Sequence, residues 1–394
     1  MIGERPAAAI AADLGELAHK PHVAAGLAVL GQPGSRDAIA TPAAVLDLDA
    51  FDRNVARMGE RARAAGLVLR PHAKSHKSAA LALRQMAAGA VGVCCAKLAE
   101  AEALAAAGVP SILVTSPIAG AASAARAAAL AARTTDFAIV VDHPDGAREL
   151  GEAAGAPMTV LIDVDVGLGR TGVASPEQAA AVVRAIAAQP MLRLRGVQAY
   201  GGQWQHLPGA NARAAAVADG MVHLNRVIAA IRAAGGAVEV VTGGGTGTFQ
   251  ADAAQGVMTE LQPGSYAFMD RDYREALAAD PDGAFEQSLV VQARVITVNQ
   301  DRWVTVDAGL KAFATDGPLP QPLTPKFAAC AYRYFGDEQG LLMRPEGQEV
   351  ARGERVDFAP PHIDPTLDRY ELIHVVQGEV LVDILRLEAR GASQ

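Results

Sequence analysis

The fold is decided by residues 157–188, which read PMTVLIDVDVGLGRTGVASPEQAAAVVRAIAA. The first nine residues are mostly apolar and are typical of a buried strand, and after a Gly-rich loop the Ala-rich segment 176–188 has the composition of a helix. A strand followed by a helix is a βα unit, which joins parallel strands through a right-handed crossover. The stretch therefore predicts a parallel sheet covered by helices.

The same unit recurs along the chain. Seven further strand-like runs are found, at 68–73, 92–96, 111–116, 136–142, 194–200, 237–243 and 259–263. Most of them are separated by Ala-rich segments with a helical pattern, such as 78–88, 98–107 and 210–234. A total of eight parallel strands favours closure into a (β/α)8 TIM-type barrel, and an open doubly wound sheet is the alternative.

Both ends of the chain differ from the barrel. From residue 286 to 394 the segments are β-rich, with Pro, Gly and Asp at turns and no long helical pattern, which predicts a C-terminal all-β domain. The segment 36–49 contains an early strand that we expect to join this β domain. We therefore expect the barrel to occupy 50–285 and residues 1–35 to form a loosely ordered extension.

Composition excludes several classes of protein. The chain has 394 residues, of which 51% are hydrophobic and 20% charged, as in a globular protein with a sizeable core. A net charge of -8 and the absence of Lys or Arg runs argue against nucleic acid as a partner. The uncharged stretch 103–125 is interrupted by prolines, so no membrane span is expected. Because no secretory signal is recognised and the three cysteines include adjacent Cys94 and Cys95, we expect a cytoplasmic protein.

The first candidate for chemistry is PHAKSHK, residues 71–77, at the end of the first barrel strand. Catalytic groups of such barrels lie at the carboxyl ends of the strands. The chain has only six lysines among its 35 basic residues, and two of them, Lys74 and Lys77, lie here. A lysine with a lowered pKa forms a Schiff base, which an arginine cannot do. Lys74 is therefore the candidate nucleophile, with a surface basic patch as the alternative.

A glycine-rich loop follows another strand. The sequence VTGGGTGT, residues 241–248, lets backbone N–H groups approach an anion, as in the phosphate sites of barrels. It lacks the spacing and the lysine of a nucleotide P-loop. Taken alone it also fits a flexible turn, but ELQPGSY at 260–266 ends the next strand with Gly264 and Ser265. The two segments together predict a phosphate site on adjacent strands.

Two further motifs carry charged side chains. In DVDVGLGRTGV, Asp163 and Asp165 are either metal ligands or, as we favour, a structural network, while Arg170 is interpreted as a cofactor contact. In PPHIDPT, His362 and Asp364 lie two residues apart, and we expect an extended stretch that presents both on one face. Such a pair suits a divalent ion that keeps open positions, although an isolated motif of this kind also fits a solvated turn.

These motifs together resemble the D-threonine aldolase group of the alanine-racemase-like, fold type III pyridoxal phosphate enzymes, within the D-serine dehydratase-like superfamily. The similarity covers residues 41–391, and its specific elements are RPHAK, ELQPGSYAFMD and HIDPT in this order. The resemblance implies that Lys74 carries pyridoxal phosphate as a Schiff base. The other cofactor contacts that it implies are Gly243, Gly244, Gly245, Thr246, Gly264 and Ser265 at the phosphate, Arg170 and Tyr200 at the ring, and a neutral Gln262 where racemases hold the pyridine nitrogen with an arginine.

The resemblance also implies a metal and a reaction. His362 and Asp364 would bind a divalent ion, Mn2+ first and Mg2+, Co2+ or Zn2+ as alternatives, which grips the β-hydroxyl of the substrate. The enzyme, a homodimer, would cleave a D-β-hydroxy amino acid to glycine and an aldehyde. His206 is the candidate base by sequence position, and a core or phosphate-network histidine is its alternative reading.

Three residues depart from the group's pattern. Gly201 stands where its aldolases usually have a histidine, Ala96 replaces a glutamine and Gln339 replaces a histidine. These changes leave open a 3-hydroxy-D-aspartate aldolase, or a D-serine or 3-hydroxyaspartate dehydratase. Dehydratases of the group more often have cysteine in the place of Asp364, which favours aldol chemistry. A non-catalytic pyridoxal phosphate-binding protein is disfavoured because such proteins are short single barrels.

Overall fold

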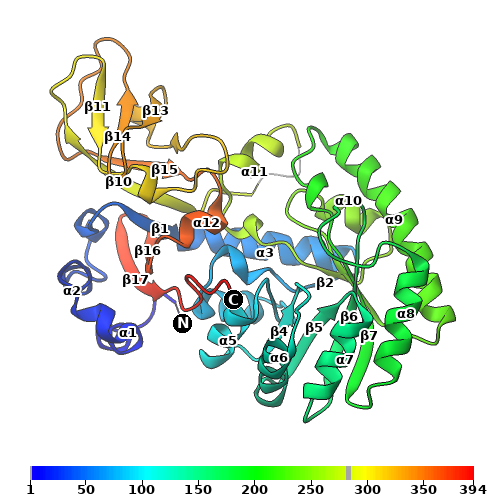
Figure 1. Cartoon of the computed structure of the whole chain (residues 1–394). Coiled ribbons are helices and arrows are strands. Elements are labelled where there is room, and N and C mark those ends of the chain that lie inside the picture. Colours follow the sequence, from blue (N-terminus) through cyan, green and yellow to red (C-terminus); the bar gives the residue numbers. More distant parts are fainter. Residues whose placement is uncertain (1, 281–284) are drawn as a thin grey trace. The chain divides into compact units, whose positions relative to one another are not determined.

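The computed structural model of the chain describes residues 2–280 and 285–394 (Figure 1). The chain divides into two compact units. The barrel unit contains Ala56–Gly264 with residues 276–280 and 391–394, and the β unit contains residues 2–55, Ser265–Glu275 and 285–390. The predicted barrel range of 50–285 therefore wrongly includes residues 50–55, Ser265–Glu275 and Phe285, which belong to the β unit. Its residues 281–284 lie outside the described part of the chain.

The barrel unit is built on eight parallel strands. Their order in the sheet is β2 (Val68–Leu69), β9 (Glu260–Leu261), β8 (Val240–Gly243), β7 (Leu192–Ala199), β6 (Met158–Val164), β5 (Asp136–Val141), β4 (Ser111–Val114) and β3 (Val93–Cys95). The two ends of this sheet are joined, because Val91 N donates to Leu69 O and Cys94 N donates to Pro71 O, both at 2.8 Å. The closed (β/α)8 barrel is thus confirmed, and the open sheet is excluded.

Helices follow most of the strands, as the βα pattern predicts. They are α4 (Ala79–Ala87), α5 (Leu98–Ala106), α6 (Ala121–Arg133), α7 (Pro144–Ala153), α8 (Pro176–Ala187), α9 (Ala210–Ala233) and α10 (Phe249–Ala254), while α3 (Leu48–Ala64) precedes β2. Local signals explain the start of α8, since Ser175 Oγ accepts from Gln178 N at 3.3 Å and Pro176 occupies its first turn. Among the described residues, α9 alone is long and apolar enough to cross a bilayer by length and composition. It packs against α8 and α10, as a barrel helix does.

The β unit contains a nine-stranded sheet. Its main path is β13 (Ala331–Tyr334), β14 (Gly340–Met343), β11 (Trp303–Val306), β10 (Leu289–Thr297), β1 (Ala43–Asp47), β16 (Leu372–Gln377) and β17 (Val380–Arg386). Off this path, β15 (Arg355–Ala359) pairs with β10, and β12 (Gln321–Pro322) pairs with β15. The expectation that the early strand joins the β domain is confirmed, because β1 lies between β10 and β16.

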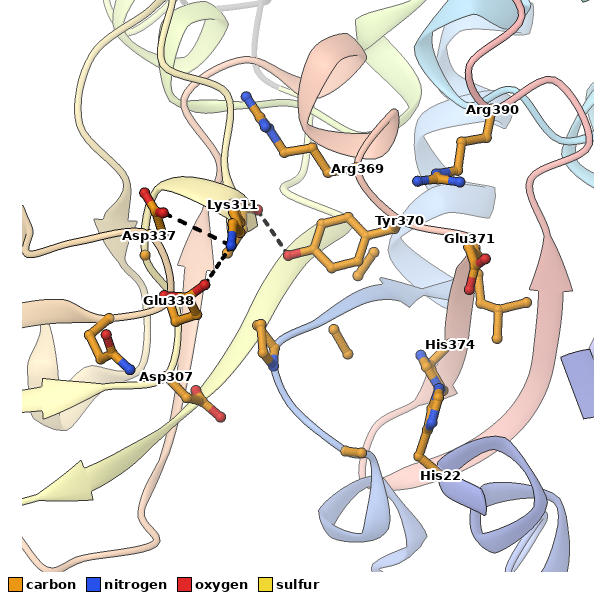
Figure 2. A pocket seen from close by; sticks show the side chains of 18 residues that line it. His22, Asp307, Lys311, Asp337, Glu338, Arg369, Tyr370, Glu371, His374 and Arg390 are labelled. Carbon is orange, nitrogen blue, oxygen red and sulfur yellow. Dashed lines mark hydrogen bonds and ion pairs between the residues drawn. The ribbon is translucent and has the colours of Figure 1, made fainter. Parts of the chain in front are cut away.

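A cavity of about 530 Å³ lies within the β unit (Figure 2). His22, Asp307, Arg369 and Tyr370 are among the residues that line it, together with His374 from β16. Burial lowers the pKa of His374 to about 4, so its imidazole is neutral at physiological pH. The residues that line the cavity therefore include charged groups such as Asp307 and Arg369, whereas His374 is uncharged.

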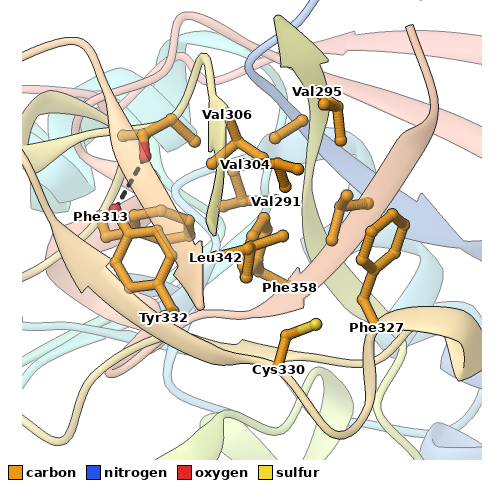
Figure 3. Close-up of a cluster of buried hydrophobic side chains, with 14 residues drawn as sticks. Val291, Val295, Val304, Val306, Phe313, Phe327, Cys330, Tyr332, Leu342 and Phe358 are labelled. Carbon is orange, nitrogen blue, oxygen red and sulfur yellow. Dashed lines mark hydrogen bonds between the residues drawn. The ribbon is translucent and has the colours of Figure 1, made fainter. Parts of the chain in front are cut away.

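The core of the β unit is partly aromatic (Figure 3). Phe313 lies with its ring centroid 5.6 Å from those of Tyr332 and Phe358, in edge-on arrangements. The Tyr332 hydroxyl donates to Ala308 O at 2.7 Å, which satisfies the polar end of this buried side chain. Packing thus fixes Phe313, which lies between β11 and β12, to residues of β13 and β15.

The expectation of loose order for residues 1–35 is wrong for residues 2–35, and residue 1 lies outside the described part of the chain. Helices α1 (Ala7–Leu14) and α2 (Pro21–Ala28) form there, with a 3-10 turn between them. Ile10, Leu14 and Val23 are fully or almost fully buried, in one cluster with Leu381 and Ile384 of β17. The physical reason is that the apolar face of β16 and β17 needs a cover, which this segment provides.

The segment Ser265–Glu275 was expected in the barrel and lies in the β unit instead. Phe268 packs on Phe51 with ring centroids 5.4 Å apart, and Tyr266 packs on Phe285 at 5.6 Å. Ser288 N also donates to Phe268 O at 2.9 Å. Aromatic packing therefore draws this segment to the β unit directly after the last barrel strand.

Candidate active site

Lys74 lies on a 3-10 turn, Ala73–Ser75, that directly follows β2. Its side chain is half-buried, and its carbonyl oxygen accepts a 2.8 Å hydrogen bond from Lys77 Nζ. Glu100 of α5 is buried close enough for both lysines to act on it electrostatically. Burial raises the pKa of Glu100, and the two lysines oppose this shift. The strand end thus holds a partly desolvated lysine beside a buried carboxyl group.

A polar network crosses the barrel interior at the strand ends. Gln262 Nε2 donates to Thr242 Oγ1 at 3.0 Å and to Gln198 Oε1 at 3.3 Å. Gln198 Nε2 in turn donates to Asp163 Oδ1 at 2.9 Å, and Thr171 Oγ1 donates to Asp163 Oδ2 at 2.8 Å. Gln262 is therefore held by neutral partners.

The two acids of the DVD segment are structural. Asp163 belongs to this network, and burial raises its pKa. Asp165 Oδ1 accepts from the backbone N–H groups of Gly167 at 2.9 Å and Gly169 at 3.0 Å. Both carboxylates therefore shape the loop that carries Arg170, and the interpretation of these acids as a structural network is supported by their contacts.

The glycine-rich loop follows β8 and is backed by Gln205. Gly247 N donates to Gln205 Oε1, and Gln205 Nε2 donates to Thr248 Oγ1, both at 2.9 Å. A β-carbon on Gly245 or Gly247 would overlap Gln205. Gly244 has a φ of +72°, which a residue with a side chain rarely adopts. Glycine is thus required at Gly247, where the overlap is with the backbone of Gln205, and is favoured at Gly244 by its φ. Thr246 is buried between these positions.

The last phosphate candidates lie after β9. Gly264 lies beside the turn that carries Lys74, since a β-carbon on it would be 3.1 Å from His72 O, and His72 N donates to Pro263 O at 3.2 Å. Ser265 follows directly in the chain but is buried in the β unit. The structure thus brings the Gly264 loop and the Lys74 loop together.

Arg170 and Tyr200 come together at the ends of β6 and β7. The guanidinium carbon of Arg170 lies 5.6 Å from the centroid of the Tyr200 ring, in a cation–π contact. His206, the candidate base, is exposed in the loop after β7. Trp204, which lies between Tyr200 and His206 in the chain, is buried. A β-carbon on Gly201 would overlap its indole ring.

In the β unit, His362 and Asp364 lie at the start of α12 (Ile363–Leu367). The extended stretch that we expected is wrong beyond His362, because the helix begins at Ile363 and places Asp364 in its first turn. Asp270 Oδ2 accepts from Ile363 N at 2.9 Å, which fixes the residue between the two candidates. Burial raises the pKa of Asp270 to about 7, with His362 lowering this pKa and Asp364 raising it. His362 and Asp364 therefore both influence the pKa of the buried Asp270 carboxyl group.

His362 and Asp364 provide the types of donor group that a two-ligand metal site uses. One imidazole and one carboxylate suit a divalent ion that takes its other ligands from water or substrate. The part of the chain that the structure describes contains no group of three or more His, Cys, Asp or Glu side chains placed to hold a metal. None of the predicted site residues lines the cavity of Figure 2.

The sequence analysis missed three residues of these sites. Gln205 backs the glycine loop, Asp270 holds the backbone between the metal candidates, and Asp316 Oδ2 lies 2.9 Å from His362 Nδ1. Gln205 lies beside His206 in the QWQH segment, and its polar side chain next to a candidate residue is the sequence feature that could have indicated a role in the site. Asp270 is the last residue of the ELQPGSYAFMD motif, and Asp316 lies in a turn-like segment outside the motifs. No local pattern indicates the partners of either residue.

Comparison with known proteins agrees with this geometry. Residues 46–272 match the family model of the alanine racemase N-terminal domain, and residues 288–376 match that of a serine dehydratase domain. The chain is 38% identical to a D-threonine aldolase of Arthrobacter sp., with 92% of this chain and 96% of that protein covered. It is 34% identical to a 3-hydroxy-D-aspartate aldolase of Paracoccus denitrificans, with 90% and 92% covered.

A solved structure, the D-threonine aldolase from Filomicrobium marinum, superposes with a TM-score of 0.87 at 38% identity. The match covers 91% of this chain and 98% of that one. Similarity thus extends over both units, each of which also matches a family model. The chain therefore belongs to the alanine racemase N-terminal domain family of fold type III, pyridoxal phosphate-dependent enzymes.

Proposed function

We propose that this enzyme is an aldolase that cleaves D-β-hydroxy amino acids such as D-threonine to glycine and an aldehyde. The observation that carries the proposal is the 38% identity to a D-threonine aldolase over 92% of this chain. Lys74 and the glycine loop lie within the range that matches the alanine racemase N-terminal domain, and the His362–Asp364 pair lies within the range that matches the serine dehydratase domain. We also propose that it acts in the cytoplasm, in keeping with its three free, buried cysteines, and that it forms a homodimer.

Lys74 and the glycine loop are the proposed holders of pyridoxal phosphate. Lys74 Nζ would bind the aldehyde carbon, and the backbone N–H groups of residues 243–246, with Gly264 and Ser265, would hold the phosphate. When bound, the cofactor supplies an electron sink for the bond that breaks at Cα. Gln262, held by Thr242 and Gln198, would offer the pyridine nitrogen an uncharged partner.

Arg170 and Tyr200 would flank the ring. In their cation–π contact, Arg170 carries a permanent positive charge beside the Tyr200 ring. Because Arg170 lies in a loop shaped by Asp165, its position depends on the backbone contacts of Gly167 and Gly169. This arrangement supports a role for Arg170 in orienting the cofactor.

His362 and Asp364 are the proposed ligands of a divalent ion, with Mn2+ as our first choice. When bound, the ion would lower the pKa of the substrate's β-hydroxyl. His206 is the proposed acceptor of the hydroxyl proton, since Gly201 has no side chain to take it. Exposure of His206 to solvent favours this role, because a base must exchange its proton with water after each turnover.

Product analysis on matched amino acids tests the proposal. D-threonine and D-phenylserine should yield glycine and an aldehyde, with the L isomers inert. An ion fixed by two residues reaches the β-hydroxyl of only one configuration at Cα. D-3-Hydroxyaspartate belongs in the panel because the Paracoccus relative is named for it. A keto acid and ammonia as products would replace the proposal with a dehydratase.

A further inference from the structure

Asp316 contacts one particular nitrogen of His362. Its Oδ2 lies 2.9 Å from His362 Nδ1, and the His362 side chain is one-third exposed. A neutral imidazole carries its proton on one nitrogen and a lone pair on the other. Because a carboxylate only accepts hydrogen bonds, the contact requires the proton on Nδ1. In the neutral form of the His362 imidazole, the lone pair is therefore on Nε2.

We propose that Asp316 is a positioning residue that holds His362 in the Nδ1–H tautomer and directs Nε2 to the divalent ion. The inference rests on the proposed function, which assigns His362 and Asp364 to that ion. Metal-binding histidines commonly donate their second N–H to a carboxylate, and removal of such a partner typically costs about 10- to 100-fold in metal affinity.

The pair is built into the fold. Thr366, which is fully buried, donates through Oγ1 to His362 O at 2.7 Å and accepts from Ala314 N at 3.0 Å. Ala314 lies two residues before Asp316, and its carbonyl oxygen accepts from the Tyr334 hydroxyl at 3.0 Å. One buried threonine thus links the Asp316 segment to the His362 segment, so the two side chains meet because their backbones are held.

Asp270 holds the backbone of the same segment. It accepts from Ile363 N and Tyr273 N, both at 2.9 Å, and it is fully buried. Asp270 therefore fixes the backbone between His362 and Asp364, whereas Asp316 fixes the imidazole ring. Asp270 and Asp316 thus have different structural roles beside the proposed ligands.

Mn2+ titration of the chelator-treated enzyme, with its pyridoxal phosphate retained, tests the proposal. Bound ion is measured from the electron paramagnetic resonance signal of free Mn2+. Asp316→Ala should weaken binding about 10- to 100-fold, and Asp316→Asn should weaken it less, because its carbonyl oxygen still accepts from Nδ1–H. Asp301→Ala, which removes an exposed carboxylate from the turn between β10 and β11, is the matched control.

A second measurement does not need the metal. Nitrogen-15 spectra of the metal-free protein, labelled at histidine and recorded at alkaline pH, report the tautomer of each imidazole. His362, assigned by its loss in His362→Gln, should be in the Nδ1–H form, and Asp316→Ala should move it toward the Nε2–H form. The cofactor absorption spectrum of each variant shows whether it is folded.

The outcomes separate the two proposals. Mn2+ affinity and tautomer both unchanged in Asp316→Ala would overturn the role of Asp316. If the wild-type enzyme does not bind Mn2+, the metal part of the proposed function fails. A His362 tautomer that changes in Asp316→Ala would still support the role of Asp316 in orienting the His362 imidazole. An affinity loss without a tautomer change would make Asp316 a ligand, contrary to the inference.

Discussion

The Trp204 indole lies over Gly201 so closely that a β-carbon on Gly201 would overlap it. The same ring is bounded by Gly220 of α9, where a β-carbon would overlap it as well. Trp204 is only 7% exposed, so it fills the space between two glycines. The group's aldolases usually have a histidine at the position of Gly201. Here the space that a side chain at this position would enter is occupied by the Trp204 ring.

Replacing Gly201 should destabilise the enzyme. Gly201→Ala must displace Trp204, and overpacking of this kind costs about 1–3 kcal/mol. Gly201→His should lower the thermal midpoint further and should not raise aldolase activity. Thermal unfolding followed by tryptophan fluorescence measures the change. Gly155→Ala, at an exposed glycine with open space around it, is the control and should leave the midpoint unchanged.

Lys74 should carry the cofactor covalently. The purified enzyme should be yellow, and borohydride reduction followed by peptide mapping should find the label on Lys74, because this lysine is partly desolvated at a barrel strand end. Lys74→Ala should bind pyridoxal phosphate without the Schiff-base absorption band. Lys97→Arg should retain the band, and a label on Lys77 or Lys97 would falsify the assignment.

Chelation should abolish turnover and leave the cofactor spectrum largely intact, since His362 and Asp364 are separate in sequence from the residues assigned to pyridoxal phosphate. His362→Ala and Asp364→Ala should each reproduce the effect, and Mn2+ should restore activity to the chelated wild type alone. The assay is aldehyde formation from D-threonine, with metal content verified by elemental analysis. Full activity in a verified metal-free sample would contradict the metal's role.

The parts of the fold that follow from local pattern were predictable. Buried β-strands such as β6, each followed by an Ala-rich helix, predict a parallel barrel, because the pattern repeats at each unit. The helices α1 and α2 were missed because their burial depends on β16 and β17, which lie more than 340 residues later in the chain. Lys74 and the glycine loop lie where strand ends predict them, but the contacts of Asp316 and Gln205 arise only from tertiary packing.

The N-terminal helices should contribute to the stability of the β unit. Ile10 is fully buried among Leu381, Ile384 and Val23, so Ile10→Ala leaves a cavity and should cost about 2–5 kcal/mol. Denaturant unfolding followed by circular dichroism measures the loss. Leu319→Ala, at a side chain that is 43% exposed, should cost far less. Equal effects of the two substitutions would mean that residues 1–35 do not pack as described.

Asp252 should make the stability of the barrel unit fall as pH rises. Burial raises its pKa from 3.8 to about 7, against hydrogen bonds that include the 2.7 Å donation from Thr248 Oγ1. Between these two pH values the folded state binds more protons than the unfolded state, so the free energy of unfolding decreases with increasing pH. The difference corresponds to at most about 4 kcal/mol.

Asp252→Asn should therefore flatten this pH dependence between pH 4 and 7, because an amide carries no charge and its oxygen still accepts from Thr248. Urea unfolding at a series of pH values, on the enzyme with its cofactor bound, gives the slope for each protein. Asp219→Asn, at an exposed residue of α9, should keep the wild-type slope. If Asp252→Asn also keeps that slope, Asp252 titrates with an ordinary pKa. Its carboxylate would then accept from Thr248 and from the backbone of Gly245 in the glycine loop in charged form at physiological pH.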